Sequence, residues 1–213
     1  SITSGFFGKY IGDRNSEIIT SLFVSISALL SLILFYQVIV NHYESNVVVA
    51  TWINSGTLNV NWSIKVDALS SVMLVVVTLV SSLVHIYSIG YMSHDPHKPR
   101  FMAYLSLFTF SMLTLVTSDN FLQLFFGWEG VGLCSYFLIG FWFKKDSANA
   151  AAIKAFVVNR VGDFGFALGI FLIFYLFGTV NYSEVFQQIP KIVDKELLFL
   201  GIHIKAIDLI CIL

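Results

Sequence analysis

One acidic residue lies deep inside a long apolar run of this chain and is the first candidate for chemistry. Glu129 falls in the run 121–143, about 12 Å from its start at roughly 1.5 Å per helical residue. A charge at that depth in hydrocarbon costs a few kcal/mol or more, so the carboxyl must be protonated or paired with a cation on another helix. A carboxyl poised between these two states accepts and releases protons, as a proton path requires. A neutral acid that is hydrogen-bonded for packing is the structural alternative.

Three glycines flank this acid in the segment GWEGVG. Gly127, Gly130 and Gly132 each lower helix stability by up to about 1 kcal/mol, but they permit close backbone approach or local loosening. We therefore expect water or a partner helix to reach Glu129 here. Close helix packing alone would also account for the glycines.

A second set of ionisable residues lies in the apolar run 151–177. Arg160 and Asp163 are spaced i, i+3, so they share one helix face and can pair, either as a structural or as a functional ion pair. Lys154 lies close to the start of the run. Its long side chain either reaches back to the membrane surface or joins a polar axis inside the membrane.

Histidine can relay protons because its ordinary pKa is near neutrality. His85 lies well inside the run 68–92, where it is either a relay or a hydrogen-bonded core residue. Lys205 and Asp208 repeat the i, i+3 spacing in the run 197–213. The candidate proton-path residues are therefore Glu129, Lys154, Arg160, Asp163 and His85, followed by Lys205 and Asp208.

The composition requires that lipid surround these residues. Hydrophobic residues make up 57% of the chain and charged residues 12%, against about 25% charged in soluble domains. Runs of about 20 apolar residues predict spanning helices. We expect an all-α polytopic bundle that forms a single membrane domain over 1–213. Its five complete spans are expected at 18–40, 68–92, 101–117, 121–143 and 151–177, with a sixth begun at 197–213.

The segments between the runs carry further signals. Residues 42–65 partly alternate apolar and polar residues around Ser55-Gly56, which predicts a β-hairpin at about 46–64. Residues 181–196 are amphipathic and predict a short helix in the membrane interface. Basic residues favour the inner side for the loops 9–17, 93–100 and 144–150. These loops hold Lys9, Arg14, Lys98, Arg100, Lys144 and Lys145, against Lys65, Lys191 and Lys195 in the opposite loops.

Motifs for other functions are missing from the sequence. There is no GxGxxG, P-loop, CxxC or HExxH pattern, so we expect no cofactor and no metal in this chain. Cys134 and Cys211 lie in apolar runs without metal-ligand spacing and are read as packing residues. A net charge of −1 without a basic patch excludes nucleic-acid binding.

Three segments resemble a known family. WEGVGLCSYFLIGFWFKKDSANAAAIKAFVVNRVGDFGFALGIF (128–171), VDALSSVMLVVVTLVSSLVHIYSIGYM (66–92) and WINSGTLNVNW (52–62) closely resemble subunit 5 of respiratory complex I, the proton-translocating NADH–ubiquinone oxidoreductase. Multi-subunit sodium/proton antiporters and membrane-bound hydrogenases are related families. The resemblance implies a subunit that moves protons, while FMN, iron–sulfur clusters and ubiquinone are held by other subunits. It also implies the mitochondrial inner membrane, or alternatively a bacterial plasma membrane.

The resemblance also assigns roles to particular residues. Glu129 matches the acid of the family's fifth helix, which pairs with a lysine of the seventh helix. Arg160 and Asp163 match charged positions of the sixth helix, and His85 and Lys154 match positions in the same polar region. The resemblance places the partner lysine shortly after residue 213 and makes residues 1–10 only the end of the family's first helix.

We therefore expect either a split product completed by a second polypeptide or a segment of a longer chain. The expected partners are the other membrane-arm subunits, including a neighbouring antiporter-like subunit, together with membrane lipids. Two alternative functions are a component of a cation/proton antiporter and a structural remnant of the subunit that does not pump.

Overall fold

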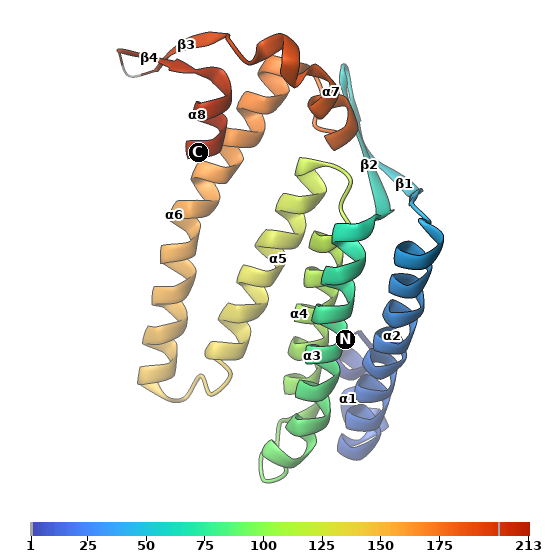
Figure 1. Ribbon diagram of the computed structural model, residues 1–213. Helices are drawn as coiled ribbons and strands as arrows, with labels where there is room; N and C mark the ends of the chain where they lie inside the picture. Colours follow the sequence, from blue (N-terminus) through green and yellow to red (C-terminus); the bar gives the residue numbers. More distant parts are fainter. Residues whose placement is uncertain (1, 200) are drawn as a thin grey trace.

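Long helices form the body of the molecule in this computed structural model, which describes residues 2–199 and 201–213 (Figure 1). Within the described residues, five helices are long and apolar enough to cross a membrane. They are α2 (Asp13–Asn41), α3 (Ala68–Tyr91), α4 (Lys98–Val116), α5 (Phe121–Ile139) and α6 (Asp146–Phe177). The predicted polytopic bundle with five spans is thus confirmed.

The helix ends differ from the ends of the apolar runs. Helices α2, α4 and α6 begin earlier than predicted, at Asp13, Lys98 and Asp146. Polar first turns explain this difference, because they continue a helix beyond its apolar part. Pro99 lies in the first turn of α4, where its missing N–H leaves no helical hydrogen bond unmade. Helix α5 ends early, at Ile139, before the turn that begins with Gly140.

The helices pack through small and hydroxyl-bearing side chains. Helices α2, α3 and α4 contact one another, α5 packs on α4, and α6 packs on α5 (Figure 1). Between α2 and α3, the hydroxyls of Ser25 and Ser82 lie 2.9 Å apart, and those of Ser31 and Thr78 lie 2.7 Å apart. Large apolar side chains such as Leu83 and Phe171 are exposed instead. This distribution is typical of helices that are surrounded by lipid.

The predicted β-hairpin is present at one end of the bundle. Strands β1 (Ser45–Ser55) and β2 (Leu58–Val66) pair antiparallel, with Gly56 at a positive φ of 59° in the turn. Gln123 of α5 anchors the hairpin: its Oε1 accepts from the Ser63 N–H at 3.0 Å, and its Nε2 donates to the Ser63 carbonyl at 2.7 Å. The hairpin is therefore fixed to the start of the helix that carries Glu129.

The predicted amphipathic helix is also present, as α7 (Tyr182–Ile192), at the same end of the molecule. Val185 is buried, whereas Phe186 is exposed. The Tyr182 hydroxyl lies 3.0 Å from that of Ser118. Burial raises the pKa of Tyr182 to about 12, and Asp119 adds to this shift while the Ser118 hydrogen bond opposes it. Tyr182 therefore anchors α7 as a neutral phenol.

The sixth apolar run does not begin as predicted. A second hairpin forms from β3 (Glu196–Phe199) and β4 (Ile202–Lys205), and α8 (Ala206–Ile212) begins only after it. Gly201 has a φ of +83° in the turn, and on β4 the polar residues His203 and Lys205 alternate with isoleucines. The apolar content of this segment resembled that of a helix, but its glycine turn and the alternation on β4 are those of a hairpin.

Two faces of the bundle are distinguished below. The hairpin face carries β1–β2, α7 and β3–β4. The loop face carries the α1–α2, α3–α4 and α5–α6 connections, as Figure 1 shows, with α1 at Ile2–Ile11. The structure thus places the three predicted basic loops together. Lys9 is one of the basic residues of these loops, and its side chain lies outside the part of the chain that the structure describes.

Candidate proton-transfer site

Glu129 of α5 forms an ion pair with Arg160 of α6. The Arg160 Nη1 donates to both carboxylate oxygens of Glu129. The Glu129 side chain is 24% exposed and that of Arg160 is 47% exposed. A cation from another helix therefore accompanies the half-buried acid, which is one of the two states that its depth in the membrane allows.

Asp163 shares the same guanidinium. Its Oδ2 lies 3.8 Å from the Arg160 Nη1, while its Oδ1 accepts a hydrogen bond of 2.8 Å from the Trp128 indole N–H. The predicted i, i+3 pair is therefore present, but it is longer than the contact with Glu129. Two carboxylates and one guanidinium form this cluster, so the ionised cluster carries one net negative charge and attracts a further cation. We call these four residues, Trp128, Glu129, Arg160 and Asp163, the α5–α6 cluster.

An aromatic ring supports the guanidinium from the side. The Arg160 guanidinium carbon lies 4.7 Å from the centre of the Phe156 ring, one helical turn earlier in α6. A cation over a ring face is attracted by the ring quadrupole. This contact favours the arginine orientation in which Nη1 reaches α5.

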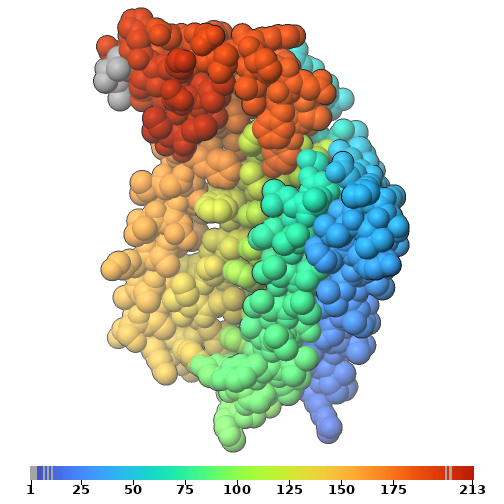
Figure 2. All heavy atoms as spheres, in the orientation of Figure 1, coloured from blue at the N-terminus to red at the C-terminus, as the bar shows by residue number. Residues whose placement is uncertain are grey.

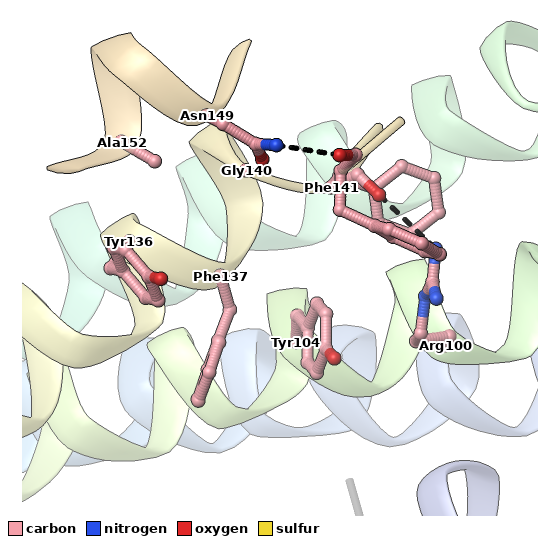
Figure 3. Close-up of a pocket in the computed structure, with 9 residues that line it drawn as sticks. Arg100, Tyr104, Tyr136, Phe137, Gly140, Phe141, Asn149 and Ala152 are labelled. Carbon is pink, nitrogen blue, oxygen red and sulfur yellow. Dashed lines mark hydrogen bonds between the residues drawn. The ribbon is translucent and has the colours of Figure 1, made fainter. Parts of the chain in front are cut away.

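The α5–α6 turn sets how the two helices face each other. Arg100 of α4 donates from Nη2 to the Phe141 carbonyl at 3.1 Å, and Asn149 of α6 donates from Nδ2 to the Phe143 carbonyl at 2.6 Å (Figure 3). Both residues line a cavity of about 210 Å³ between the ends of α4, α5 and α6. The turn is thus held from both sides, which fixes the relative positions of Glu129 and Arg160.

A carboxylate of the α3–α4 loop adds a third tie to this turn. Asp95 accepts from the Trp142 indole N–H at 2.9 Å and from the His97 backbone N–H at 2.8 Å. Burial acts to raise the pKa of Asp95, but these two hydrogen bonds and the neighbouring positive charges hold it below its ordinary value. Asp95 therefore stays ionised at neutral pH and keeps its hydrogen bonds.

The glycines around Glu129 have different surroundings. A Cβ on Gly127 would lie 2.7 Å from the Leu115 Cα, and one on Gly130 would lie 2.7 Å from the Ser111 Oγ. These two glycines permit the close contact of α5 with α4, as predicted. A Cβ on Gly132 would meet nothing within 4 Å. Gly132 therefore faces open space rather than a packed helix.

That space is a cavity of about 670 Å³ between α5 and α6. Figure 2 shows the surface hollowed between these helices, α5 in yellow-green and α6 in orange. Six of the residues that line the cavity are Trp128, Gly132, Ser135, Asn159, Gly162 and Asp163. Trp128 and Asp163 of the α5–α6 cluster therefore border a space large enough for water or for a side chain of another helix.

His85 belongs to a separate network between α3 and α4. It is fully buried, with its Nδ1 2.8 Å from the Ser81 carbonyl and its Nε2 3.2 Å from the Ser106 hydroxyl. The Ser81 hydroxyl lies 2.5 Å from that of Thr109. His85 thus has partners on both ring nitrogens, an arrangement that suits a core residue and a relay equally.

The remaining candidates lie outside these two networks. Lys154 is exposed on α6, roughly two turns after the helix begins. Lys205 is exposed at the end of β4, where its Nζ lies 3.6 Å from Asp194. Asp208 is exposed in the first turn of α8. Lys205 therefore lies just before α8 rather than on it, and its ammonium group contacts Asp194.

The sequence analysis missed Trp128 as part of the site. Its position next to Glu129 was visible, but whether its indole pointed toward α6 depended on how the two helices pack. The sequence analysis also placed Glu17 in a loop, whereas this acid is buried in α2 in the structure.

Two known families match the chain over most of its length. The family described as NADH-ubiquinone oxidoreductase (complex I), chain 5 N-terminus, matches residues 52–102. The family described as NADH:quinone oxidoreductase/Mrp antiporter, transmembrane, matches residues 118–208 and thus includes the α5–α6 cluster.

Individual relatives match along the whole chain. NADH-ubiquinone oxidoreductase chain 5 of Arabidopsis thaliana is 54% identical over 100% of this chain and 32% of its own length. That of Chondrus crispus is 51% identical over 99% of this chain and 32% of its own length. NADH-quinone oxidoreductase subunit L of Rickettsia bellii is 49% identical over 100% of this chain and 33% of its own length. The chain therefore spans about a third of the length of these relatives.

Two solved structures share the fold. A chain of the membrane-bound sulfane sulfur reductase, an archaeal respiratory membrane complex, has a TM-score of 0.73 and 19% identity, covering 86% of this chain and 37% of that chain. A chain of the Mrp complex from Dietzia sp. DQ12-45-1b has a TM-score of 0.71 and 22% identity, covering 86% of this chain and 19% of that chain. At these identities the likeness shows the fold alone.

Proposed function

Because this chain belongs to the chain 5 family of complex I membrane subunits and corresponds to its N-terminal portion, we propose that it translocates protons. In this proposal, Glu129 lies in a half-channel that couples NADH:ubiquinone electron transfer to proton movement. The chain is a multi-pass membrane protein of an inner membrane. We assign it to the mitochondrial inner membrane, with a bacterial plasma membrane as the alternative, since plant, algal and rickettsial relatives all match.

The observation that carries this proposal is the sharing of one guanidinium by two carboxylates. Arg160 donates to both carboxylate oxygens of Glu129, while Asp163 lies 3.8 Å from the same nitrogen. If Arg160 moves toward Asp163, the charge on Glu129 loses its partner in a medium of low dielectric constant. Glu129 then takes up a proton, and the return of Arg160 favours its release.

The α5–α6 cavity leaves room for a further charged partner of the α5–α6 cluster. Gly132 and Gly162 both leave open space on this side, and the cluster's net negative charge favours a second cation. Helix α8 lies beside α6 nearby, with the Leu213 carbonyl 2.8 Å from where a Cβ on Gly165 would stand. We propose that the expected partner lysine of Glu129 approaches the cluster through this cavity, from the side of Trp128 and Asp163. It would come from a second polypeptide or from further residues of a longer chain.

The other candidates receive different roles in this proposal. His85 connects α3 and α4 through hydroxyl groups and serves as a proton relay or as a hydrogen-bonded core residue. Lys154 lies on the exposed side of α6 and contributes positive charge near the loop face. Lys205 and Asp208 lie toward the hairpin face, away from the α5–α6 cluster, and we assign them no transfer step. FMN, iron–sulfur clusters and ubiquinone would be bound by partner subunits of the membrane complex.

The experiment changes Glu129 to glutamine in the assembled complex and measures proton uptake and NADH:quinone turnover in sealed vesicles. A transferring carboxyl typically contributes about 10²-fold or more to a rate, so we expect transfer through this subunit to fall by that factor. The matched control is Glu184→Gln, which removes an exposed acid of α7.

Each alternative predicts a different outcome. Normal turnover and normal proton uptake in the Glu129→Gln complex would leave only the structural role. Cation transport that requires sodium and proceeds without NADH would identify an antiporter component instead.

A further inference from the structure

A single guanidinium lies at a cavity of the loop face whose described lining includes no acid. The cavity has a volume of about 210 Å³ and lies where the ends of α4, α5 and α6 meet, as Figure 3 shows. Arg100 is the one charged residue among the described residues that line it, and the polar ones are Tyr104, Tyr136 and Asn149. A cation without a counter-ion in a partly enclosed space attracts an anion.

The head of the Arg100 side chain is positioned toward this cavity. Its guanidinium carbon lies 4.6 Å from the centre of the Phe141 ring and 5.3 Å from that of Phe143, and both residues line the cavity. Its Nη2 donates to the Phe141 carbonyl, and its Nε is buried without an acceptor in the described part of the chain. A guanidinium has five N–H donors. The hydrogen-bonding capacity of Arg100 is therefore far from filled.

The acid of the neighbouring loop compensates this charge only in part. Asp95 interacts electrostatically with Arg100, but its two oxygens accept from the Trp142 indole and from the His97 backbone N–H. Within the described residues, no ion pair of 4 Å or less joins Asp95 to Arg100. The guanidinium therefore remains free to bind a second anion.

The position of the cavity favours a lipid as the source of this anion. Arg100 lies in the first turn of α4, immediately before the apolar run that begins at Phe101, so it stands at the membrane boundary. The adjoining α5–α6 turn carries exposed Lys144 and Lys145, and the exposed acid Asp146 follows them. Basic residues at this depth attract anionic lipids, and basic pockets between spanning helices bind their headgroups.

A row of aromatic rings runs across the three helices at the cavity. Tyr104 of α4 stacks on Phe137 of α5 at 5.1 Å, and Tyr136 packs on Phe137 at 5.7 Å and on Phe156 of α6 at 5.3 Å. Neither tyrosine hydroxyl has a hydrogen-bond partner among the described residues. Tyrosine suits the boundary between headgroups and acyl chains, because its ring is apolar and its hydroxyl is a donor.

We propose that this cavity binds the phosphate of an anionic glycerophospholipid from the leaflet at the loop face. The Arg100 guanidinium binds the phosphate, the hydroxyls of Tyr104 and Tyr136 donate to its oxygens, and the aromatic row supports the first part of the acyl chains. At about 30 Å³ for each molecule, the cavity has room for roughly seven waters and therefore for a phosphate group. The site is separate from the α5–α6 cluster and does not depend on the proposed function.

Photocrosslinking of the full chain in phosphatidylcholine nanodiscs tests this proposal. The probe is phosphatidylglycerol that carries a diazirine close to its headgroup, added as a small fraction of the lipid, and mass spectrometry identifies the labelled residues. We expect labelling in the segments 100–104 and 136–152. Unlabelled phosphatidylglycerol should suppress this labelling, whereas further phosphatidylcholine should not.

Variants of the lining residues test the assigned contacts. Arg100→Gln should lower the apparent affinity for the probe about tenfold, because a charge-assisted hydrogen bond is lost. Tyr104→Phe keeps the ring and its stacking and should lower the affinity about threefold. The matched control is Arg14→Gln, which removes an exposed arginine of the same face and should leave the labelling nearly unchanged. Glu129→Gln should also leave it unchanged, which separates this site from the proposed function.

Three results would overturn the proposal. The first is labelling that neither Arg100→Gln nor Tyr104→Phe reduces, and Tyr104→Phe alone decides this if Arg100→Gln does not insert into the membrane. The second is competition by free glycerol phosphate that equals that of phosphatidylglycerol, which would identify a site for a soluble phosphate. The third is labelling of the chain alone that is lost in the assembled complex, which would mean that a partner subunit fills the cavity.

Discussion

At the scale of single residues, two kinds of carboxylate can be distinguished. Asp67 and Asp95 are held ionised by hydrogen bonds, whereas Glu129 can change its partner. Asp95 and Asp67 lie outside the spans and each accept hydrogen bonds that fix their charge. Glu129 instead depends on a single arginine that lies near a second carboxylate. For this reason we assign the proposed proton transfer to Glu129 and structural roles to Asp67 and Asp95.

Asp67 gives a prediction about pH dependence. It caps α3 by accepting from the Ser70 N–H at 2.8 Å, and it pairs with Lys65 at 3.0 Å. Burial acts to raise the pKa of Asp67, but the Ser70 and Lys65 contacts hold it below the ordinary value of 3.8. Because the folded pKa is lowered, this stabilisation is fully present above 3.8 and disappears as the pH falls through the folded value.

Thermal unfolding in nanodiscs at decreasing pH measures this contribution. Asp67→Asn keeps a good helix cap but removes the titrating charge, so its stability should depend less on pH in the acidic range. Asp67→Ala should lose about 1 kcal/mol at neutral pH because the cap itself is lost. Equal pH dependence in Asp67→Asn and the unchanged chain would show that the Asp67 charge does not contribute.

At the scale of elements, the contact between α4 and α5 determines where Glu129 stands. Gly127 and Gly130 lie on the side of α5 that touches α4, and Gly132 lies on the side that faces the cavity. The sequence predicted that these glycines permit close approach, but it did not show which of them meets a helix. That distinction depends on the rotation of α5, which is set by packing rather than by local sequence.

The glycines give a matched pair of variants. In Gly127→Ala the new Cβ would lie 2.7 Å from the Leu115 Cα, so α4 and α5 must separate, at a cost of about 1–3 kcal/mol. In Gly132→Ala the Cβ meets nothing within 4 Å, and stability should stay equal or rise by up to about 1 kcal/mol. Unfolding in nanodiscs compares the two. Similar stabilities would mean that the close α4–α5 contact does not form.

At the scale of the whole molecule, hydropathy predicted the helix bundle. It did not predict the features that depend on tertiary contacts. The five spans were predictable because long apolar runs alternate with polar segments, and the first hairpin was predictable from Ser55-Gly56. The segment 196–205 was not, because a short apolar run is compatible with a strand and with a helix. Likewise Glu129 and Arg160 were each identified, but 31 residues separate them and only the packing of α6 on α5 shows that they meet.

The distribution of basic residues predicts the orientation of the bundle. The loop face carries most of the loop arginines and lysines, so it should lie on the inner, negative side of the membrane. Single cysteines at Lys145 and Glu184, in a chain with Cys134→Ala and Cys211→Ser, allow this to be measured with an impermeant maleimide. We expect Lys145→Cys to react only from the inner side and Glu184→Cys only from the outer side. The reverse pattern would mean that the bundle is inverted.

The central claim is that Glu129 and Arg160 act as one coupled unit across α5 and α6. A double-mutant cycle of Glu129→Gln, Arg160→Gln and the combined variant, with proton uptake measured in vesicles of the assembled complex, tests it most directly. We expect the double variant to be no slower than the slower single variant, which corresponds to a coupling of about 0.5–3 kcal/mol. Independent losses that multiply in the double variant would contradict the coupling and with it the proposed transfer step.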